Sequence, residues 1–175
     1  MVLDQNSYNV QSRCISATIM QTFSVSYTFN QRFPVPAQDA FNWATDYQPN
    51  DLAIMGENGK RRIRKLTKDA IILEDDVTLG GKKIRKVKLV RINPRILSWH
   101  NIQLQGPNKH SEFIYEVSPH RNRKSRLTFT GLLVIYSMNR LSRQKLRQIA
   151  NREKQYDSKA WRLLTKAMIK ELQKA

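Results

Sequence analysis

The sequence predicts an α+β fold: a seven-stranded curved antiparallel sheet with two short helices after strand 1 and a long C-terminal helix across the concave face. Three observations predict this layout. From Lys60 to Tyr136 the chain reads as strand after strand, separated by turn residues. A helix-like stretch precedes that block. A strongly amphipathic helix closes the chain, and its broad apolar face needs a large hydrophobic surface to lie on.

Composition sets the size and the general class of the protein. The chain has 175 residues, of which 40% are hydrophobic and 9% aromatic, enough for the core of one domain. We assign that domain to residues 22–175 and regard residues 1–21 as an N-terminal extension. The formal net charge is +17, which favours anionic partners and does not determine the fold.

The first strand is predicted over residues 22–33, because large apolar side chains alternate with small polar ones. The apolar set is Phe23, Val25, Tyr27 and Phe29. Pro34 and Pro36 end the strand. A short helix follows, with apolar side chains at helical spacing: Ala37, Ala40, Phe41 and Ala44. Pro49 breaks it, and a second short helical turn runs through Met55.

Six further strands are expected over residues 60–67, 70–78, 83–92, 96–104, 110–118 and 124–136. Turn residues separate them, such as Gly80-Gly81 and Gly106-Pro107-Asn108. The short connections favour antiparallel neighbours.

The closing helix is predicted over residues 156–173. Its apolar stripe contains Trp161, Leu164, Met168 and Leu172, and cations repeat on the opposite side. Residues 139–155 are polar and basic, and we expect a loop and the outer part of this helix there, with Ser142 as a candidate cap.

This order of elements resembles the START/Bet v 1-like superfamily, also called SRPBCC or helix-grip proteins, which includes polyketide cyclases, dehydrases and lipid carriers. The most specific segment is FPVPAQDAFNWATDYQPNDL, which is similar to a superfamily signature through Pro36, Ala37, Phe41, Trp43 and Asp46. The resemblance covers residues 22–173. It implies a cavity between sheet and helix that binds a hydrophobic molecule. Some members of the superfamily contact a protein partner instead.

A curved sheet gripped by one helix leaves space that short side chains cannot fill, and such space commonly becomes a ligand pocket. The side chains expected to line it are Trp99, Phe113, Tyr115, Phe129, Tyr136, Trp161, Leu164 and Met168. An ordinary packed core formed by the same residues is the alternative. His100 is the one histidine expected to face the cavity as a polar group.

The sequence indicates no metal site and no cofactor. The three histidines lack the spacing of a helical zinc site, and one cysteine, Cys14, is present. No nucleophile elbow or phosphate-binding glycine loop occurs. The consecutive acids Glu74, Asp75 and Asp76 point to alternating faces of a strand, so we expect them to pair with cations of the neighbouring KKIRKVK segment.

Cations gather in the segments GKRRIRKLTK and KKIRKVK. We expect the outward residues to form a basic convex surface that contains Arg62, Arg64, Lys86 and Lys88. An anionic membrane is a candidate partner for it. Nucleic acid is a weaker one, because no nucleic-acid-binding signature is found.

The leading functional hypothesis is binding or transport of a hydrophobic, lipid-like small molecule in the cavity. An enzyme of the polyketide cyclase or dehydratase kind in the same cavity, or a basic module that contacts nucleic acid or protein, are the alternatives. A polar acid/base pair in the cavity would favour the enzyme, and a purely apolar cavity the carrier. Low cysteine content and the lack of a signal-like or membrane-spanning segment suggest a cytoplasmic protein.

Overall fold

The structure is a computed structural model, and it describes residues 20–173. Seven strands form one antiparallel sheet in the order β1-β7-β6-β5-β4-β3-β2. The strands are β1 (Gln21–Phe33), β2 (Asn58–Thr67), β3 (Ala70–Leu79), β4 (Lys82–Asn93), β5 (Ser98–Gln105), β6 (Glu112–His120) and β7 (Lys124–Ser137). The helices are α1 (Ala37–Thr45), α2 (Asp51–Ile54) and α3 (Arg143–Leu172). The predicted fold class is therefore confirmed. The predicted extension, residues 1–21, lies almost wholly outside the described residues.

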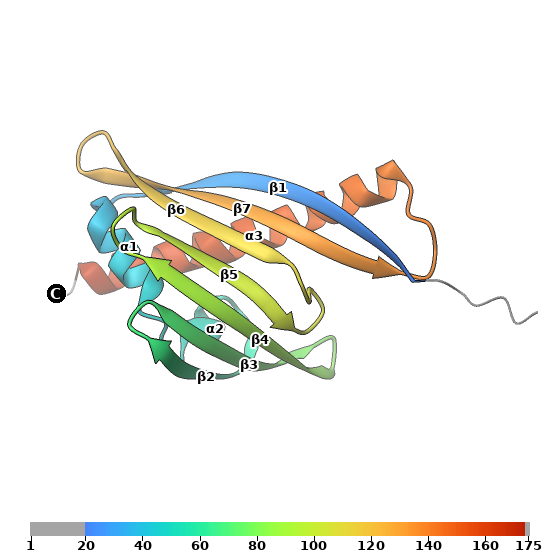
Figure 1. Cartoon of the computed structure of the whole chain (residues 1–175). Helices are drawn as coiled ribbons and strands as arrows, with labels where there is room; N and C mark the ends of the chain where they lie inside the picture. The colour runs from blue at the N-terminus through green and yellow to red at the C-terminus, as the bar shows by residue number, and fades with distance from the viewer. Residues whose placement is uncertain (1–19, 174–175) are drawn as a thin grey trace, which may run out of the picture.

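All three helices pack on the concave face of the sheet. Helix α3 lies behind the sheet in the view of Figure 1 and contacts the edge strand β1. Aromatic contacts join the layers: Phe41 of α1 packs edge-on against Trp99 of β5, and Trp161 of α3 lies 6.0 Å from Trp99 between ring centroids. The solid part of the core surrounds Phe33, Leu127 and Met168, which are fully buried.

Helix α3 is longer than the sequence pattern indicated. The expected helix covered residues 156–173, whereas α3 begins at Arg143. Ser142 is its N-cap, since its hydroxyl accepts a hydrogen bond of 3.2 Å from the Lys145 backbone nitrogen, as expected for a cap. Ile149 continues the apolar stripe and packs against the core, so the additional turns are held by both a cap and a core contact.

Two strands begin later than predicted because the chain turns where we expected extended backbone. Residues 94–97 form a turn that ends at Leu97 with φ +49°, so β5 starts at Ser98 and not at residue 96. His110 has φ +69° and closes the β5–β6 connection, so β6 starts at Glu112 and not at residue 110. Both turns place a non-glycine residue in the left-handed region, which the sequence pattern does not reveal.

Candidate functional site

A cavity of about 450 Å³ lies between the concave face of the sheet and the middle of α3. Its size is in the range typical of small-molecule pockets. The sheet contributes one wall, α3 the opposite wall, and the segment from α1 to the start of β2 a third. Some lining residues are exposed and mark the side open to solvent: Leu79, Pro107, Arg152 and Tyr156.

An aromatic surface forms one part of the cavity wall. Trp99 and the neighbouring Tyr115 on β6 stack with their rings nearly parallel, 4.7 Å apart and inclined by 3°. Trp161 of α3 lies 5.8 Å from Tyr115, and Phe113 lines the cavity beside it. These rings give this part of the wall an aromatic, largely apolar lining.

A buried ion-pair cluster forms the base of the cavity next to α2. Arg61 binds both carboxylate oxygens of Asp75, at 2.7 and 3.1 Å, and donates a third bond of 2.9 Å to Asp51. Lys88 donates to Asp75 at 3.0 Å. Burial alone would raise the pKa of Asp75, but its bonds to Arg61 and the charge of Lys88 outweigh burial, so the pKa is lowered. Asp75 is therefore ionised, although its side chain has no exposed surface.

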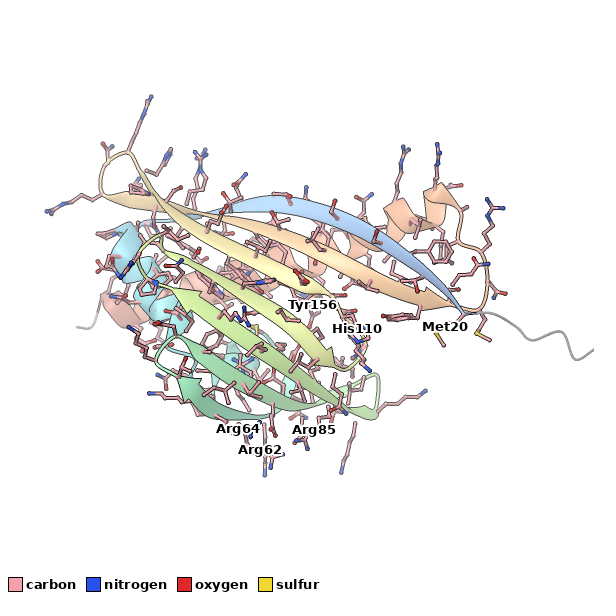
Figure 2. All side chains as sticks on the ribbon, in the orientation of Figure 1. Met20, Arg62, Arg64, Arg85, His110 and Tyr156 are labelled. Atoms are coloured by element: carbon pink, nitrogen blue, oxygen red, sulfur yellow. The ribbon has the colours of Figure 1, made fainter. Side chains whose placement is uncertain are left out.

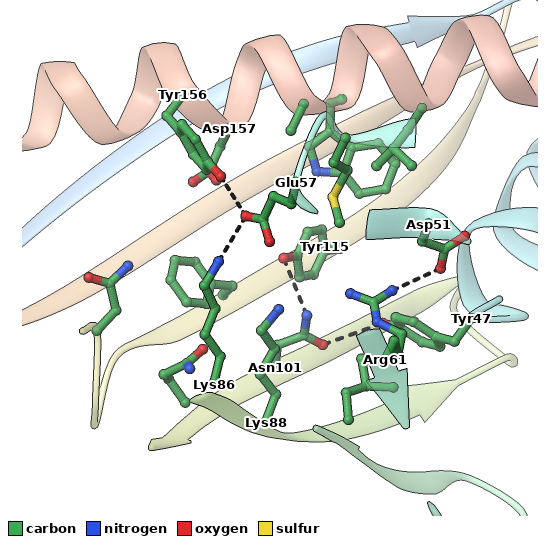
Figure 3. Close-up of a pocket in the computed structure, with 18 of the residues that line it drawn as sticks. Tyr47, Asp51, Glu57, Arg61, Lys86, Lys88, Asn101, Tyr115, Tyr156 and Asp157 are labelled. Atoms are coloured by element: carbon green, nitrogen blue, oxygen red, sulfur yellow. Dashed lines mark hydrogen bonds and ion pairs between the residues drawn. The ribbon is translucent and has the colours of Figure 1, made fainter. Parts of the chain in front are cut away.

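A second polar group lies at the open side of the cavity. The Glu57 carboxylate accepts bonds from Lys86 at 2.8 Å and from the Tyr156 hydroxyl at 2.6 Å, as Figure 3 shows. These contacts join the segment after α2 to β4 and to α3. Despite partial burial, they lower the pKa of Glu57.

Asp157 is the carboxyl group with the most perturbed environment in the cavity wall. Burial, with a smaller contribution from Glu153, raises its pKa to about 6, although a hydrogen bond from the Tyr27 hydroxyl acts in the opposite direction. Opposite it on the sheet, Asn101 donates to the Tyr115 hydroxyl at 3.3 Å, and its amide oxygen lies 3.5 Å from the Tyr47 hydroxyl. Asp157 can thus hold or release a proton near neutral pH, within a cavity that also offers neutral hydrogen-bonding groups.

The charges that line the cavity are balanced. Its wall contains four cations, Arg61, Lys86, Lys88 and Arg152, and four carboxyl groups, Asp51, Glu57, Glu153 and Asp157. The excess positive charge of the chain therefore lies elsewhere.

The structure places five of the eight predicted lining residues in the cavity wall: Trp99, Phe113, Tyr115, Trp161 and Leu164. Phe129 and Met168 belong instead to the solid core, with 1% and 0% exposure. Tyr136 is 45% exposed at the end of β7, where its hydroxyl contacts His110, outside the cavity.

The expected polar group, His100, is not in the cavity. Trp99 and Asn101 face inward, so strand alternation directs His100 to the convex face, where its Nε2 lies 3.1 Å from the Glu112 carboxylate.

The predicted basic convex surface is wrong for two of its four residues. Arg62 and Arg64 are exposed, but Lys86 and Lys88 line the cavity. The two lysines lie four and two residues before Val90 on β4, so their side chains point to the same face of the sheet as Val90, which is fully buried on the concave face. The expected pairing of the acidic triplet with the KKIRKVK segment is confirmed for two acids, because Asp75 contacts Lys88 on one face and Glu74 contacts Arg85, at 2.6 Å, on the other. Asp76 contacts Arg62 of β2 instead, at 3.3 Å.

Several polar cavity residues escaped the sequence reasoning: Tyr47, Asp51, Glu57, Arg61, Asn101 and Asp157. A signal existed for Asp157, which precedes Trp161 by four residues and so lies on the apolar face of the helix. An acid in that position is unusual unless it has a specific environment.

Comparison with known proteins supports the fold and leaves the activity open. No protein-family model and no curated protein sequence matches the chain. Among solved structures, the Zhui aromatase/cyclase from Streptomyces sp. R1128 superposes with a TM-score of 0.66 at 12% identity, over 87% of this chain and 96% of the other. Ara h 8.0201 superposes with a TM-score of 0.66 at 9% identity, over 85% and 99% of the two chains.

A START superfamily protein from Mycobacterium smegmatis gives a TM-score of 0.59 at 16% identity, over 79% and 93% of the two chains. The chain thus has the START/Bet v 1-like fold that its sequence resembles. Identities this low show a shared fold and nothing about the ligand or the reaction.

Proposed function

We propose that this protein binds a flat, uncharged, oxygen-bearing small molecule in the cavity between the sheet and α3. The observation that carries the proposal is the pairing of a stacked aromatic surface, Trp99 and Tyr115, with a charge-balanced polar wall. The aromatic rings suit a planar apolar body. The polar wall suits hydroxyl or carbonyl oxygens on its edge.

The polar wall argues against a purely saturated hydrocarbon ligand. Lys86, Lys88 and Asp157 line the cavity, and each has one protein partner. A lipid chain that displaced water from them would leave their remaining hydrogen-bonding capacity unsatisfied. A strongly anionic ligand is equally disfavoured, because it would have to compete with carboxylates for these cations. The proposed ligand is therefore more polar than the lipid-like molecule expected from the sequence.

Cavity filling tests this proposal. Ala160 lines the cavity from α3, whereas Ala150 lies on the same helix outside the cavity wall, so Ala160→Phe and Ala150→Phe form a matched pair. A hydroxylated flavone and a saturated fatty acid serve as probes. Their binding is measured by the quenching of tryptophan fluorescence. We expect the flavone to bind, Ala160→Phe to weaken binding at least tenfold, and Ala150→Phe to leave it unchanged. Equal binding of the flavone by both variants, or preference for the fatty acid, would refute the proposal.

A second candidate function, an enzyme of the polyketide cyclase or dehydratase kind, is favoured by Asp157. A cavity-lining carboxylate whose pKa is about 6 can accept a proton from the carbon beside a carbonyl group and then donate it to the β-hydroxyl, whose C–O bond breaks so that water leaves and a C=C bond forms. The test is incubation with a β-hydroxy ketone and detection of the conjugated product by absorbance. Turnover that is lost in Asp157→Asn while binding persists would support an enzyme. Binding without turnover in the wild type would leave a carrier.

A further inference from the structure

Three large apolar side chains are exposed together at one end of the sheet. Met20, Tyr136 and Met138 are 59%, 45% and 52% exposed. The pairing of Gln21 with Ser137 puts Met20 beside Met138, because these residues flank the paired positions at the ends of β1 and β7. Figure 2 shows Met20 at this end of the molecule, with His110, the partner of Tyr136, nearby.

The chain next to these residues is strongly basic. From Val117 to Arg152 inclusive, the sequence contains nine Arg and Lys residues and no Asp or Glu. Four of these cations follow Met138 directly, in the connection to α3 and in its first turns, and all four are exposed: Arg140, Arg143, Lys145 and Arg147. We call these four cations and the three apolar residues the tip.

Helix stability does not account for the cations of the tip. A helix N-terminus carries a partial positive charge, so acidic side chains are favourable in the first turn and cations are unfavourable. The first turn of α3 contains Arg143 and Lys145 and no acid. This arrangement works against the helix and concentrates positive charge beside exposed apolar surface.

The tip differs from the basic region formed by β2, β3 and β4. On the convex face, Arg62 and Arg85 lie next to Glu74, and Arg62 also contacts Asp76 at 3.3 Å. No ion pair among the described residues involves a cation of the tip. The tip thus lacks the ion pairs that compensate positive charge around Glu74 on the convex face.

We propose that the tip docks on an anionic lipid bilayer. Met20, Tyr136 and Met138 would enter the boundary between headgroups and acyl chains, and the four cations would lie among the anionic headgroups. Nucleic acid fits less well, since its phosphates need the cations and not the methionines. A second copy of the chain would bring like charges together. The proposal does not depend on what the cavity binds.

Vesicle sedimentation with two matched pairs of variants tests the proposal. The tip charge variant is Arg140→Glu/Arg143→Glu/Lys145→Glu. Its control, with the same change in net charge, is Arg64→Glu/Lys83→Glu/Arg91→Glu, which alters exposed cations of β2 and β4. The tip apolar variant is Met20→Ser/Met138→Ser. Its control is Leu66→Ser/Ile96→Ser, two residues that are 51% and 65% exposed elsewhere.

We expect the wild type to bind phosphatidylcholine vesicles only when they contain phosphatidylserine. Each tip variant should lower the partition coefficient at least tenfold, and each control less than threefold. The tip charge variant should melt no lower than the wild type, because glutamates are favourable at a helix N-terminus.

The proposal is overturned if the wild type does not bind these vesicles, or if the two charge variants lose binding equally, which would indicate net charge alone. It is also overturned if the apolar variant binds as the wild type does. Tighter binding to a DNA duplex than to vesicles, lost in the charge variant and kept in the apolar variant, would assign the tip to nucleic acid instead. Circular dichroism establishes that each variant is folded.

Discussion

The hydroxyl of Tyr27 on β1 donates a hydrogen bond to the carboxyl group of Asp157 on α3, and this contact joins two residues 130 positions apart in the chain. It connects an edge strand of the sheet to the helix that covers it. The same carboxyl group lines the cavity, so one contact links the stability of the fold to the chemistry of the site.

The first prediction concerns the pH dependence of stability. The pKa of Asp157 is raised from 3.8 to about 6 in the folded protein, so the folded state retains a proton that the unfolded chain releases. Stability should therefore fall as pH rises from about 4 to 6. Because one pKa unit corresponds to about 1.4 kcal/mol, the loss over the whole of this pH range and just above it is on the order of 3 kcal/mol.

Asp157→Asn keeps an acceptor for Tyr27 and removes the charge. Urea denaturation at pH 5 and pH 8 should show a smaller difference in unfolding free energy for this variant than for the wild type. Asp69→Asn, an exposed residue of the β2–β3 turn, serves as the control. An unchanged pH dependence in Asp157→Asn would be inconsistent with the raised pKa.

A second prediction concerns the buried cluster around Asp75. Asp75→Asn leaves Arg61 and Lys88 buried without a full counter-charge, and this should lower the unfolding free energy by about 3–5 kcal/mol. Asp76→Asn, its exposed neighbour, should change it by less than about 0.5 kcal/mol. Thermal or chemical denaturation measures both effects.

The cluster around Asp75 also sets an acid limit to stability, in a different pH range from that of Asp157. The folded pKa of Asp75 lies below its ordinary value of 3.8, so its contribution is complete above that value and is lost as pH falls through the folded pKa. Acid unfolding below about pH 4 should therefore be weaker in Asp75→Asn, if that variant folds.

A third prediction concerns Gly131, which pairs with Tyr27 across β1 and β7. A Cβ atom at this glycine would lie 2.5 Å from Cζ of the Tyr27 ring, so the ring must move. Gly131→Ala should destabilise the fold by about 1–3 kcal/mol. Since the clash involves one ring, combining it with Tyr27→Leu should cost less than the sum of the single changes, as a double-mutant cycle of denaturation would show. Simple additivity would argue against this contact.

A fourth prediction concerns the open side of the cavity and depends on ligand binding there. Tyr156→Phe removes the bond that joins α3 to Glu57, so α3 should separate more readily from the opposite wall. We expect the flavone probe to dissociate severalfold faster in stopped-flow measurements, with a stability change of at most about 1 kcal/mol. Tyr136→Phe loses a similar bond to His110 far from the cavity and should leave the rate unchanged.

The periodicity of apolar residues made the fold predictable. The residues that line the cavity depend in addition on which alternate residues of each strand face inward. Only a strand fits the alternation from Phe23 to Phe29, and only a helix fits the apolar stripe from Trp161 to Leu172. These two elements determine how the helix packs on the sheet. In KKIRKVK both faces carry cations and aliphatic residues, so the sequence does not determine whether Lys86 or Arg85 faces inward. Register with β3 decides it, since Lys86 pairs with the inward-facing Asp75.

The polar half of the cavity was missed for a related reason. Arg61 is one of several consecutive cations, and its burial follows from two carboxylates, Asp51 and Asp75, that only the folded chain brings together. His100 was misplaced because the inward position belongs to its neighbours. Local sequence identifies which residue types can line a site, but it does not pair residues that are distant in the chain.

The strand order has a consequence for how the chain acquires its structure. β1 leaves the ribosome before every other element of the sheet, yet its one neighbour is β7, and Gln21 must find Ser137 near the other end of the sequence. Closing so long a loop is slow in comparison with forming the hairpins from β2 to β7. Until then the inward face of β1, with Phe23, Tyr27 and Phe29, has no sheet partner. The nascent chain thus carries an unpaired hydrophobic strand through most of its synthesis, and such a strand is exposed to aggregation until β7 has been made.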